Sequence, residues 1–313
     1  MYQFLGRKKW WWFTISVLIM IPGLIGLIAW RLPLGIDFRG GTQLEITLEK
    51  SPSEGELRQK LTGLQQVRGL SLAKTDDGAF LMRILPISEA EHRAILQELE
   101  TDFGQVTERQ FQTVGPSVSQ DLTRKAIIAV VAAALLIVIY LAYSFRGLTA
   151  PISSWRFGLT AVIALLHDLF ITLGVFAILA HFFNWEVDAS FITAMLTVMG
   201  FSVHDTIVVF DRIRENAARR RELAENDFEL LADQSLSQTL NRSLATSLTV
   251  VFTLTALAVL GGESIRPFIM TLLVGIVVGT YSSIFTATPL VVVWQNIATR
   301  RVKTAVSTTS HPS

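Results

Sequence analysis

Long apolar stretches recur along most of this chain, and they have the length that a membrane-spanning helix requires. A helix needs roughly 20 consecutive apolar residues to cross about 30 Å of hydrocarbon. Six such stretches occur, at residues 11–30, 126–144, 159–180, 189–210, 244–260 and 268–294. The pattern predicts a polytopic α-helical membrane protein with six transmembrane helices. The first stretch is longer than a secretory-signal core and no small-residue cleavage site follows it, so we expect it to remain as an anchor.

One sizeable polar segment remains, residues 31–125 between the first two spans. Strands are predicted at residues 42–48, 69–74, 79–85 and 106–114, and helices at residues 53–64 and 88–103. Each helix begins with a capping box, Ser53 with Glu56 and Ser88 with Glu91. The order β-α-β-β-α-β predicts an α+β ferredoxin-like domain, whose surface we expect to contact protein.

The distribution of Lys and Arg predicts the orientation in the membrane. Basic residues gather before the first span, between the second and third, after the fourth and after the sixth: Arg7, Lys8, Lys9, Arg146, Arg156, Arg212, Arg214, Arg219, Arg220, Arg221, Arg300, Arg301 and Lys303. The turn between the third and fourth spans carries Glu186 and Asp188 and no basic residue. The positive-inside rule therefore places both termini in the cytoplasm and the polar domain outside.

These assignments divide the chain into regions. After the cytoplasmic residues 1–10 and the first helix, the external domain leads into a five-helix membrane bundle at residues 126–294. The bundle contains a cytoplasmic loop at residues 211–243, in which an amphipathic surface helix is predicted at residues 226–238. The cytoplasmic tail, residues 295–313, is rich in Ser and Thr and is predicted to be disordered.

Composition narrows the functional class. Half of the residues are hydrophobic and 17% are charged, and the chain contains no cysteine. Disulfides and thiolate metal or haem sites are therefore excluded. The chain lacks HExxH and GxSxG patterns, and its polar domain lacks a phosphate-binding loop and metal-spaced histidines. We expect no enzyme activity, no cofactor or metal, and no nucleic-acid partner.

The fourth span contains one carboxylate, Asp205, directly preceded by His204. A carboxylate in hydrocarbon costs about 2.5 to 3.5 kcal/mol even on insertion scales, so it marks a functional site with a partner to be named. Arg242, at the start of the fifth span, is the candidate partner. A guanidinium favours the charged carboxylate, so its movement would switch Asp205 between releasing and binding a proton. A purely structural ion pair is the alternative, and His204 would titrate or only donate a hydrogen bond.

Two further polar features lie inside the spans. His167 and Asp168 occupy the middle of the third span, where they form either a second stage of a proton relay or a hydrogen-bonded contact between helices; the residues alone leave both interpretations open. Gly275, Gly279 and Ser282 form a stripe of small residues in the last span. We interpret this stripe as a packing surface for the fourth span.

Several separate segments together resemble the SecF family of bacterial protein export. They are residues 35–42 (GIDFRGGT), 114–118 (VGPSV), His167-Asp168, residues 201–216 (FSVHDTIVVFDRIREN) and Asn241-Arg242-Ser243. The likeness covers about residues 11–294. One departure is His204, where the family commonly has Asn.

The resemblance implies a fold of the resistance-nodulation-division kind, in which this chain and a SecD subunit form a twelve-helix bundle. It further implies that the pair uses the proton-motive force to help draw polypeptide through the Sec translocation channel, SecYEG, across the bacterial inner membrane. The family's proton-coupling Asp and Arg fall on Asp205 and Arg242. The family's structural motifs at the membrane boundary fall on Gly35, Asp37, Gly40, Gly41, Gly115 and Pro116, of which Gly35, Gly40 and Gly41 are predicted to act as a flexible hinge.

Two other functions remain open from the residues. A small-molecule efflux pump of related architecture is disfavoured, because such pumps carry twelve spans and two large external domains in one chain. A passive scaffold subunit leaves the membrane Asp and Arg unexplained.

Overall fold

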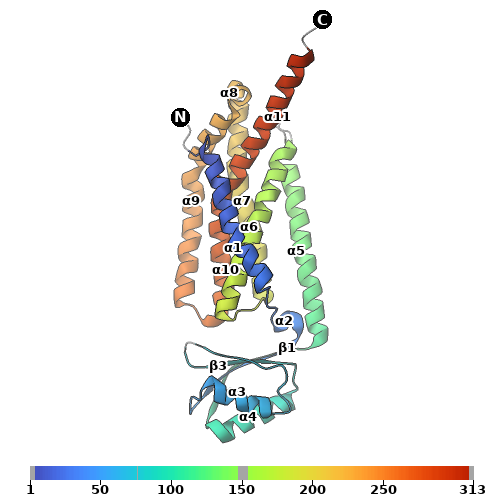
Figure 1. Ribbon diagram of the computed structural model, residues 1–313, viewed down its shortest axis with the longest axis vertical. Coiled ribbons are helices and arrows are strands. Elements are labelled where there is room, and N and C mark those ends of the chain that lie inside the picture. The colour runs from blue at the N-terminus through green and yellow to red at the C-terminus, as the bar shows by residue number, and fades with distance from the viewer. Residues whose placement is uncertain (1–3, 76, 147–153, 310–313) are drawn as a thin grey trace. The chain divides into compact units, whose positions relative to one another are not determined.

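The computed structural model describes residues 4–75, 77–146 and 154–309. It divides into two compact units. The helical unit comprises Met1–Arg31, Val130–Phe182 and Ser190–Ser313, and the smaller unit comprises Leu32–Ala129 and Phe183–Ala189. Figure 1 shows the course of the chain through both.

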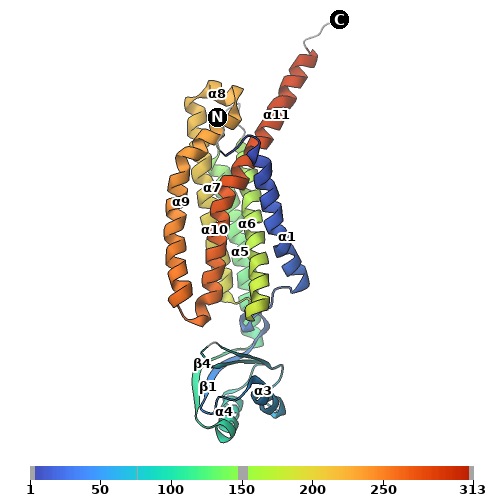
Figure 2. The ribbon, with the colours of Figure 1, turned by 60° about the vertical axis from the view of Figure 1, so that its left-hand side comes forward.

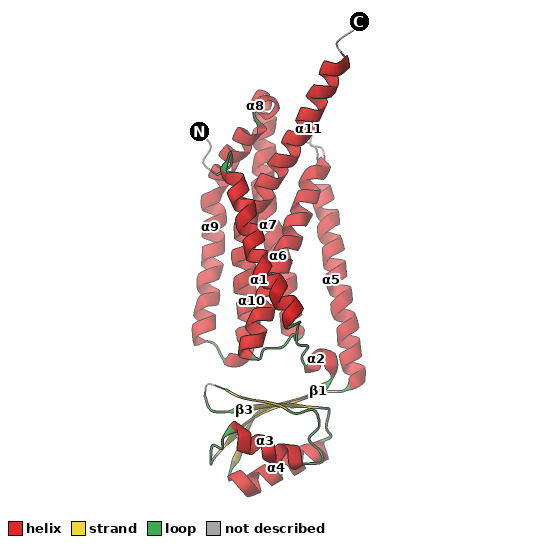
Figure 3. Ribbon diagram, in the orientation of Figure 1, coloured by secondary structure: helices red, strands yellow, loops and turns green. Residues whose placement is uncertain are grey.

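Long helices dominate the helical unit (Figure 3). Within the described residues, six helices are long and apolar enough to cross a membrane, which confirms the six predicted spans. They are α1 (Lys8–Ala29), α5 (Pro116–Ser144), α6 (Ser154–Phe183), α7 (Ala189–Arg219), α9 (Phe228–Leu260) and the run Glu263–Ala298. This last run begins with the 3₁₀ turn η1 (Glu263–Ile265) and continues through α10 (Arg266–Ser282) and the π-helical turn η2 (Ser283–Ala287) into α11 (Thr288–Thr309).

The predicted cytoplasmic loop at 211–243 is almost entirely helical. Helix α7 continues to Arg219, the short α8 (Arg221–Asn226) follows, and α9 runs without a break from Phe228. The predicted surface helix is thus the first part of the fifth span and not a separate element. The Asp227 side chain accepts a hydrogen bond from the Leu230 N–H at 3.0 Å and caps α9. No Gly or Pro follows it before the end of the helix, so nothing interrupts the helix where the membrane segment was predicted to start.

The predicted disorder of the tail also needs correction. Helix α11 extends to Thr309, whereas residues 310–313 lie outside the described part. The Ser- and Thr-rich composition suggested disorder, but once a helix exists each added residue gains one hydrogen bond without a new nucleation cost. The absence of Gly and Pro between residues 290 and 309 permits this extension.

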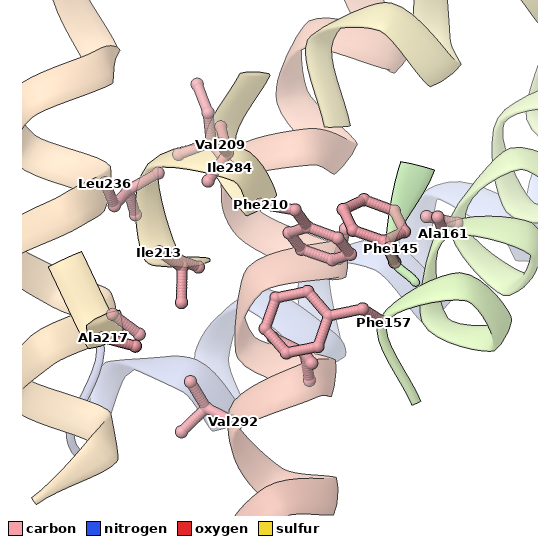
Figure 4. Packing of buried hydrophobic residues seen from close by; sticks show 14 of the residues in the cluster. Phe145, Phe157, Ala161, Val209, Phe210, Ile213, Ala217, Leu236, Ile284 and Val292 are labelled. Atoms are coloured by element: carbon pink, nitrogen blue, oxygen red, sulfur yellow. The ribbon is translucent and has the colours of Figure 1, made fainter. Parts of the chain in front are cut away.

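Aromatic side chains fill one part of the core of the helical unit (Figure 4). Phe210 on α7 lies with its ring 4.9 Å from that of Phe157 on α6 and 5.9 Å from that of Phe145, which directly follows α5. All three are essentially without exposed surface. Leu236 of α9 and Val292 of α11 belong to the same cluster. The cluster therefore fixes α7 among its neighbours only five residues beyond Asp205.

Removing the central ring of this cluster is expected to destabilise the protein strongly. Phe210→Ala should lower the free energy of unfolding by about 3 to 5 kcal/mol, because it leaves a cavity among packed rings. The measurement is thermal or denaturant unfolding of the purified chain. Phe252→Ala on α9 is the matched control, since Phe252 is 67% exposed. Equal losses in the two variants would contradict the assignment of Phe210 to the core.

Near its amino-terminal end the chain is held against α9. The N–H groups of Phe4 and Leu5 both donate to Asp233 Oδ1 at 2.8 Å. The Gly6 N–H donates to Glu229 Oε1 at 2.7 Å, and the Leu5 side chain is buried. This segment is therefore fixed to the first turns of α9.

The smaller unit contains a four-stranded sheet with helices α3 and α4 on one face (Figure 2). Its elements are β1 (Gly41–Leu48), α3 (Glu54–Gly63), β2 (Ser71–Lys74), β3 (Phe80–Ile84), α4 (Glu89–Phe103) and β4 (Val106–Val114). The strand order is β2-β3-β1-β4, and all neighbours pair antiparallel. The predicted element order is confirmed, as are both capping boxes. Alternate residues of β1 and β3 are buried under the helices.

Candidate functional site

Asp205 lies inside the helical unit and is 2% exposed. Its Oδ2 accepts a long hydrogen bond of 3.4 Å from Ser247 Oγ of α9. Thr280 Oγ1 of α10 in turn donates to Ser247 Oγ at 2.6 Å. His204 Nδ1 is 3.9 Å from Asp205 Oδ1, but the His204 side chain is 62% exposed. The carboxyl group thus meets hydroxyl groups inside the bundle and a histidine at its surface.

The predicted pair between Asp205 and Arg242 is not formed in this structure. No ion pair joins these two residues, both of which are described, and Arg242 is exposed. On α9 the residues that face inward are Ser243 and Ser247, both buried. Arg242 precedes Ser243 and therefore points away from α7 in this structure, and its coupling to Asp205 stays a prediction.

Asp168 of α6 has the denser set of contacts. Its side chain has no exposed surface, and its Oδ2 accepts hydrogen bonds from Ser202 Oγ of α7 and Ser282 Oγ of α10, each at 2.6 Å. Its Oδ1 lies 2.9 Å from His167 Nδ1. Residues of three helices, α6, α7 and α10, therefore meet at this carboxyl group. The sequence pointed to Asp168 and His167 but not to the contacts with Ser202 and Ser282.

Two glycines allow α10 to approach α7 closely. A Cβ atom added to Gly275 would lie 2.2 Å from Val198 Cγ2, and one added to Gly279 would lie 3.1 Å from Ser202 Cβ. Side chains larger than hydrogen would push the helices apart. The stripe ends at Ser282, which contacts Asp168, so it combines close packing with a polar contact.

Ser247 and Thr280 are the polar residues that sequence reasoning missed. Both are buried hydroxyl residues in otherwise apolar spans. Thr280 directly follows Gly279 of the small-residue stripe, which was the available signal. Ser247 lies four residues after the buried Ser243, a spacing that places both on one face of α9.

The Gly-rich segment before the sheet is tied to the turn between α6 and α7. The Gly35 N–H donates to the Val187 carbonyl at 2.8 Å, and the Val187 N–H donates to the Pro33 carbonyl at 2.7 Å. A short helix, α2 (Ile36–Arg39), follows. Within it, Asp37 Oδ2 accepts a hydrogen bond of 2.9 Å from the Ala189 N–H, the first residue of α7. Asp37 thereby binds one of the N–H groups at the start of that helix, where the backbone offers no intrahelical acceptor.

The two adjacent glycines of this segment are required by geometry. Gly40 has φ +75° and Gly41 has φ +154°, a region that other residues rarely adopt. A Cβ atom on Gly41 would also lie 2.9 Å from the Ile84 carbonyl oxygen. Close packing is thus sufficient to explain these glycines, and the hinge stays a prediction. At the other junction Pro116 begins α5, where proline is well tolerated, and a Cβ on Gly115 would meet nothing within 4 Å.

An ion pair lies at the same junction. Arg83 Nε of β3 lies 3.2 Å from Glu186 Oε2 of the α6–α7 turn. Burial raises the pKa of the Glu186 carboxyl above its ordinary value, and the Arg83 guanidinium partly offsets that shift. Because the pKa is raised on folding, protonation favours the folded junction: this contribution to stability is complete at low pH and is lost as pH rises through the raised pKa.

Two family models match the chain. Residues 94–297 match the model described as protein export membrane protein SecD/SecF, C-terminal, and residues 31–52 match the SecD/SecF GG motif. The protein translocase subunit SecF of Thermobaculum terrenum is 44% identical over 93% of this chain and 93% of its own length. That of Anaerolinea thermophila is 40% identical over 92% of this chain and 93% of its own length. The chain belongs to the SecF family.

A solved structure is similar to this SecF-family chain. The crystal structure of SecDF from Thermus thermophilus, a translocon-associated membrane protein, superimposes with a TM-score of 0.78 and 32% identity. It covers 90% of this chain, whereas this chain spans 37% of that protein. A second SecDF structure, in a super-membrane-facing form, gives a TM-score of 0.64 and 33% identity over 94% of this chain. The SecF-family chain is accordingly a multi-pass membrane protein.

The contact of Asp37 within the GG motif leads to a test. Asp37→Ala should destabilise the start of α7 by about 1 kcal/mol, because the hydrogen bond from the Ala189 N–H to the Asp37 side chain is lost. Asp37→Asn keeps a side-chain oxygen and should remain close to wild type. Amide hydrogen exchange at the start of α7 measures the effect, with Asp121→Ala in an exposed pair with Lys125 as the control. Unchanged exchange in Asp37→Ala would refute the capping role.

Proposed function

We propose that this chain is an accessory subunit of the bacterial Sec translocase that acts together with a SecD-type partner. The partner is inferred because the similar SecDF protein is more than twice as long as this chain. The pair would use the proton-motive force to help move polypeptide through the Sec channel, SecYEG, and release it. The site of action would be the bacterial inner membrane.

The proposal includes an orientation and a domain type. Both termini lie in the cytoplasm, as supported by the basic residues that flank the spans on one side. The smaller unit then lies outside and is a ferredoxin-like domain. Its β-α-β-β-α-β order and its antiparallel strand order β2-β3-β1-β4 support this interpretation.

The observation that carries the proton-driven part is the burial of Asp205, which has no Lys or Arg partner among the described residues. A charged carboxylate in that position is costly, so the group gains from binding a proton. Arg242 lies on α9 five residues before Ser247, which contacts Asp205. We propose that Arg242 approaches the ionised Asp205 in a second state and leaves when the acid is protonated. His204, at the surface of the bundle, would relay protons to it.

Membrane vesicles test this function directly. They should contain the chain, its SecD-type partner and the channel, with a precursor protein arrested in translocation after ATP is depleted. We expect translocation to resume when a proton gradient is imposed and to stop when a protonophore collapses it. Vesicles without the chain are the control. If translocation is completed equally well with and without the proton gradient, a passive scaffold subunit would be favoured instead.

A further inference from the structure

The contacts of Asp168 suit a carboxyl group that exchanges a proton. Asp168 is completely buried, and among the described residues its ion-pair partner is a histidine, with no Lys or Arg. A buried carboxylate without a fixed cation is disfavoured in hydrocarbon. Ser202 and Ser282 supply hydrogen bonds but no charge, so the charge balance favours a bound proton.

The network accommodates both protonation states. When Asp168 is ionised, Oδ2 accepts from Ser202 and Ser282, and Oδ1 accepts from His167 Nδ1–H. When Asp168 carries a proton on Oδ2, it can donate to Ser282 Oγ, whose own hydrogen then turns to the Gly279 carbonyl oxygen at 3.3 Å. Hydroxyl groups permit this because each both donates and accepts.

The histidine beside this carboxyl group has an unused nitrogen. His167 is 8% exposed, and its Nε2 is buried without a hydrogen-bond partner among the described residues. With Nδ1–H donated to Asp168, Nε2 is a bare acceptor in a neutral imidazole. That nitrogen is therefore a buried hydrogen-bond acceptor directly beside the carboxyl group.

The contacts of Asp168 and Asp205 involve the same two helices. Ser202, which binds Asp168, lies one turn before Asp205 on α7. Thr280, which binds Ser247 beside Asp205, lies two residues before Ser282 on α10. A movement of α10 along α7 therefore alters the hydrogen bonds of both acids at once.

We propose that Asp168, with His167, Ser202 and Ser282, is a second proton-binding site of the bundle, coupled to Asp205 through α7 and α10. The coupling rests on the proton-driven function proposed above, whereas the site itself is a statement about one carboxyl group and can be tested alone.

Infrared difference spectroscopy of the full chain with its SecD-type partner detects protonated buried carboxyl groups by their C=O stretch. In a pH titration we expect two such bands for the pair of acids. Asp168→Asn should remove one band and keep the band that Asp205→Asn removes. Ser282→Ala should shift the Asp168 band, because it deletes a hydrogen bond to that group.

Thr160→Val is the matched control on α6. Thr160 is buried and its hydroxyl is without a partner among the described residues, so this variant should leave both bands and proton flux unchanged. Proton flux through Asp168→Asn in liposomes should fall by roughly tenfold or more, as expected when a proton-transfer group is lost. Asp168→Asn protein that remains folded with its partner but keeps every carboxyl band would overturn the site. A band that disappears on adding sodium ions would also overturn it, since the site would then bind a metal cation.

The two proposals fail in different ways. If the wild-type protein shows no gradient-driven translocation but the infrared band of Asp168 is present, the proposed function is refuted and the second site is not. Absence of the band, with gradient-driven translocation intact, would refute only the second site.

Discussion

Replacing Asp205 by Asn is expected to abolish the part of translocation that depends on the proton gradient while the bundle stays folded. Asn has the same shape and can still accept the hydrogen bond from Ser247, but it cannot exchange a proton. A neutral amide also costs less than a carboxylate in hydrocarbon, so stability should be equal or higher. The rate of export should fall to the level that wild type shows after a protonophore is added.

The matched control for this variant lies on the same helix. Asp211→Asn changes a carboxylate six residues further along α7 that is 68% exposed and lies near Arg214, and it should export normally. Arg242→Met should reproduce the loss seen in Asp205→Asn if the guanidinium is needed in the second state. Normal gradient-driven export by both Asp205→Asn and Arg242→Met would leave a scaffold role as the remaining explanation.

Gly275→Leu is expected to destabilise the bundle by about 3 kcal/mol or more, at the upper end of the cost of overpacking a core. Even a Cβ atom at this position would lie 2.2 Å from Val198 Cγ2, so α7 and α10 must separate. Their separation would break the hydrogen bonds from Ser202 and Ser282 to Asp168. Thermal unfolding of the purified chain measures the loss, and proton flux should be lost with it.

A second substitution distinguishes a local clash from general damage. Gly275→Ala combined with Val198→Ala should recover most of the stability that Gly275→Ala alone loses, giving a clear interaction energy in a double-mutant cycle. Gly200→Ala on α7 is the control, since a Cβ there meets nothing within 4 Å. No recovery in the double variant would show that the α7–α10 contact is not what requires glycine.

Features with local causes could be predicted from the sequence. The capping boxes at Ser53 and Ser88 involve residues three apart, and both are present. The spans follow from apolar length alone. Residues 211–243, between the fourth and fifth spans, were predicted to form a loop because of their polar composition. They are almost entirely helical, and no residue there prevents a helix.

The details of the site depend on contacts between distant segments. Asp205 and Asp168 stand out because acids are rare in apolar spans. Nothing in the sequence near Asp168 indicates that Ser202 and Ser282, from two other helices, share its Oδ2. Arg242 was paired with Asp205 from its place at the start of the fifth span and from the family likeness, whereas its direction around α9 keeps the two side chains apart in this structure. The close approach of α1 and α6, where a Cβ on Gly174 would lie 2.4 Å from Gly23 Cα, is equally invisible in either segment alone.

The unbroken course of α9 makes it a rigid rod that joins the interior of the bundle to the segment held at its first turns. From Ser247 back to Phe228 the rod measures about 28 Å at 1.5 Å per residue. A tilt of about 10° at Ser247 would displace the Phe228 end by roughly 5 Å if the helix moves as a stiff cylinder. Phe4 and Leu5 are hydrogen-bonded to Asp233 near that end and would move with it. A small displacement at the Ser247 hydroxyl group would thus be amplified at the first turns of the helix.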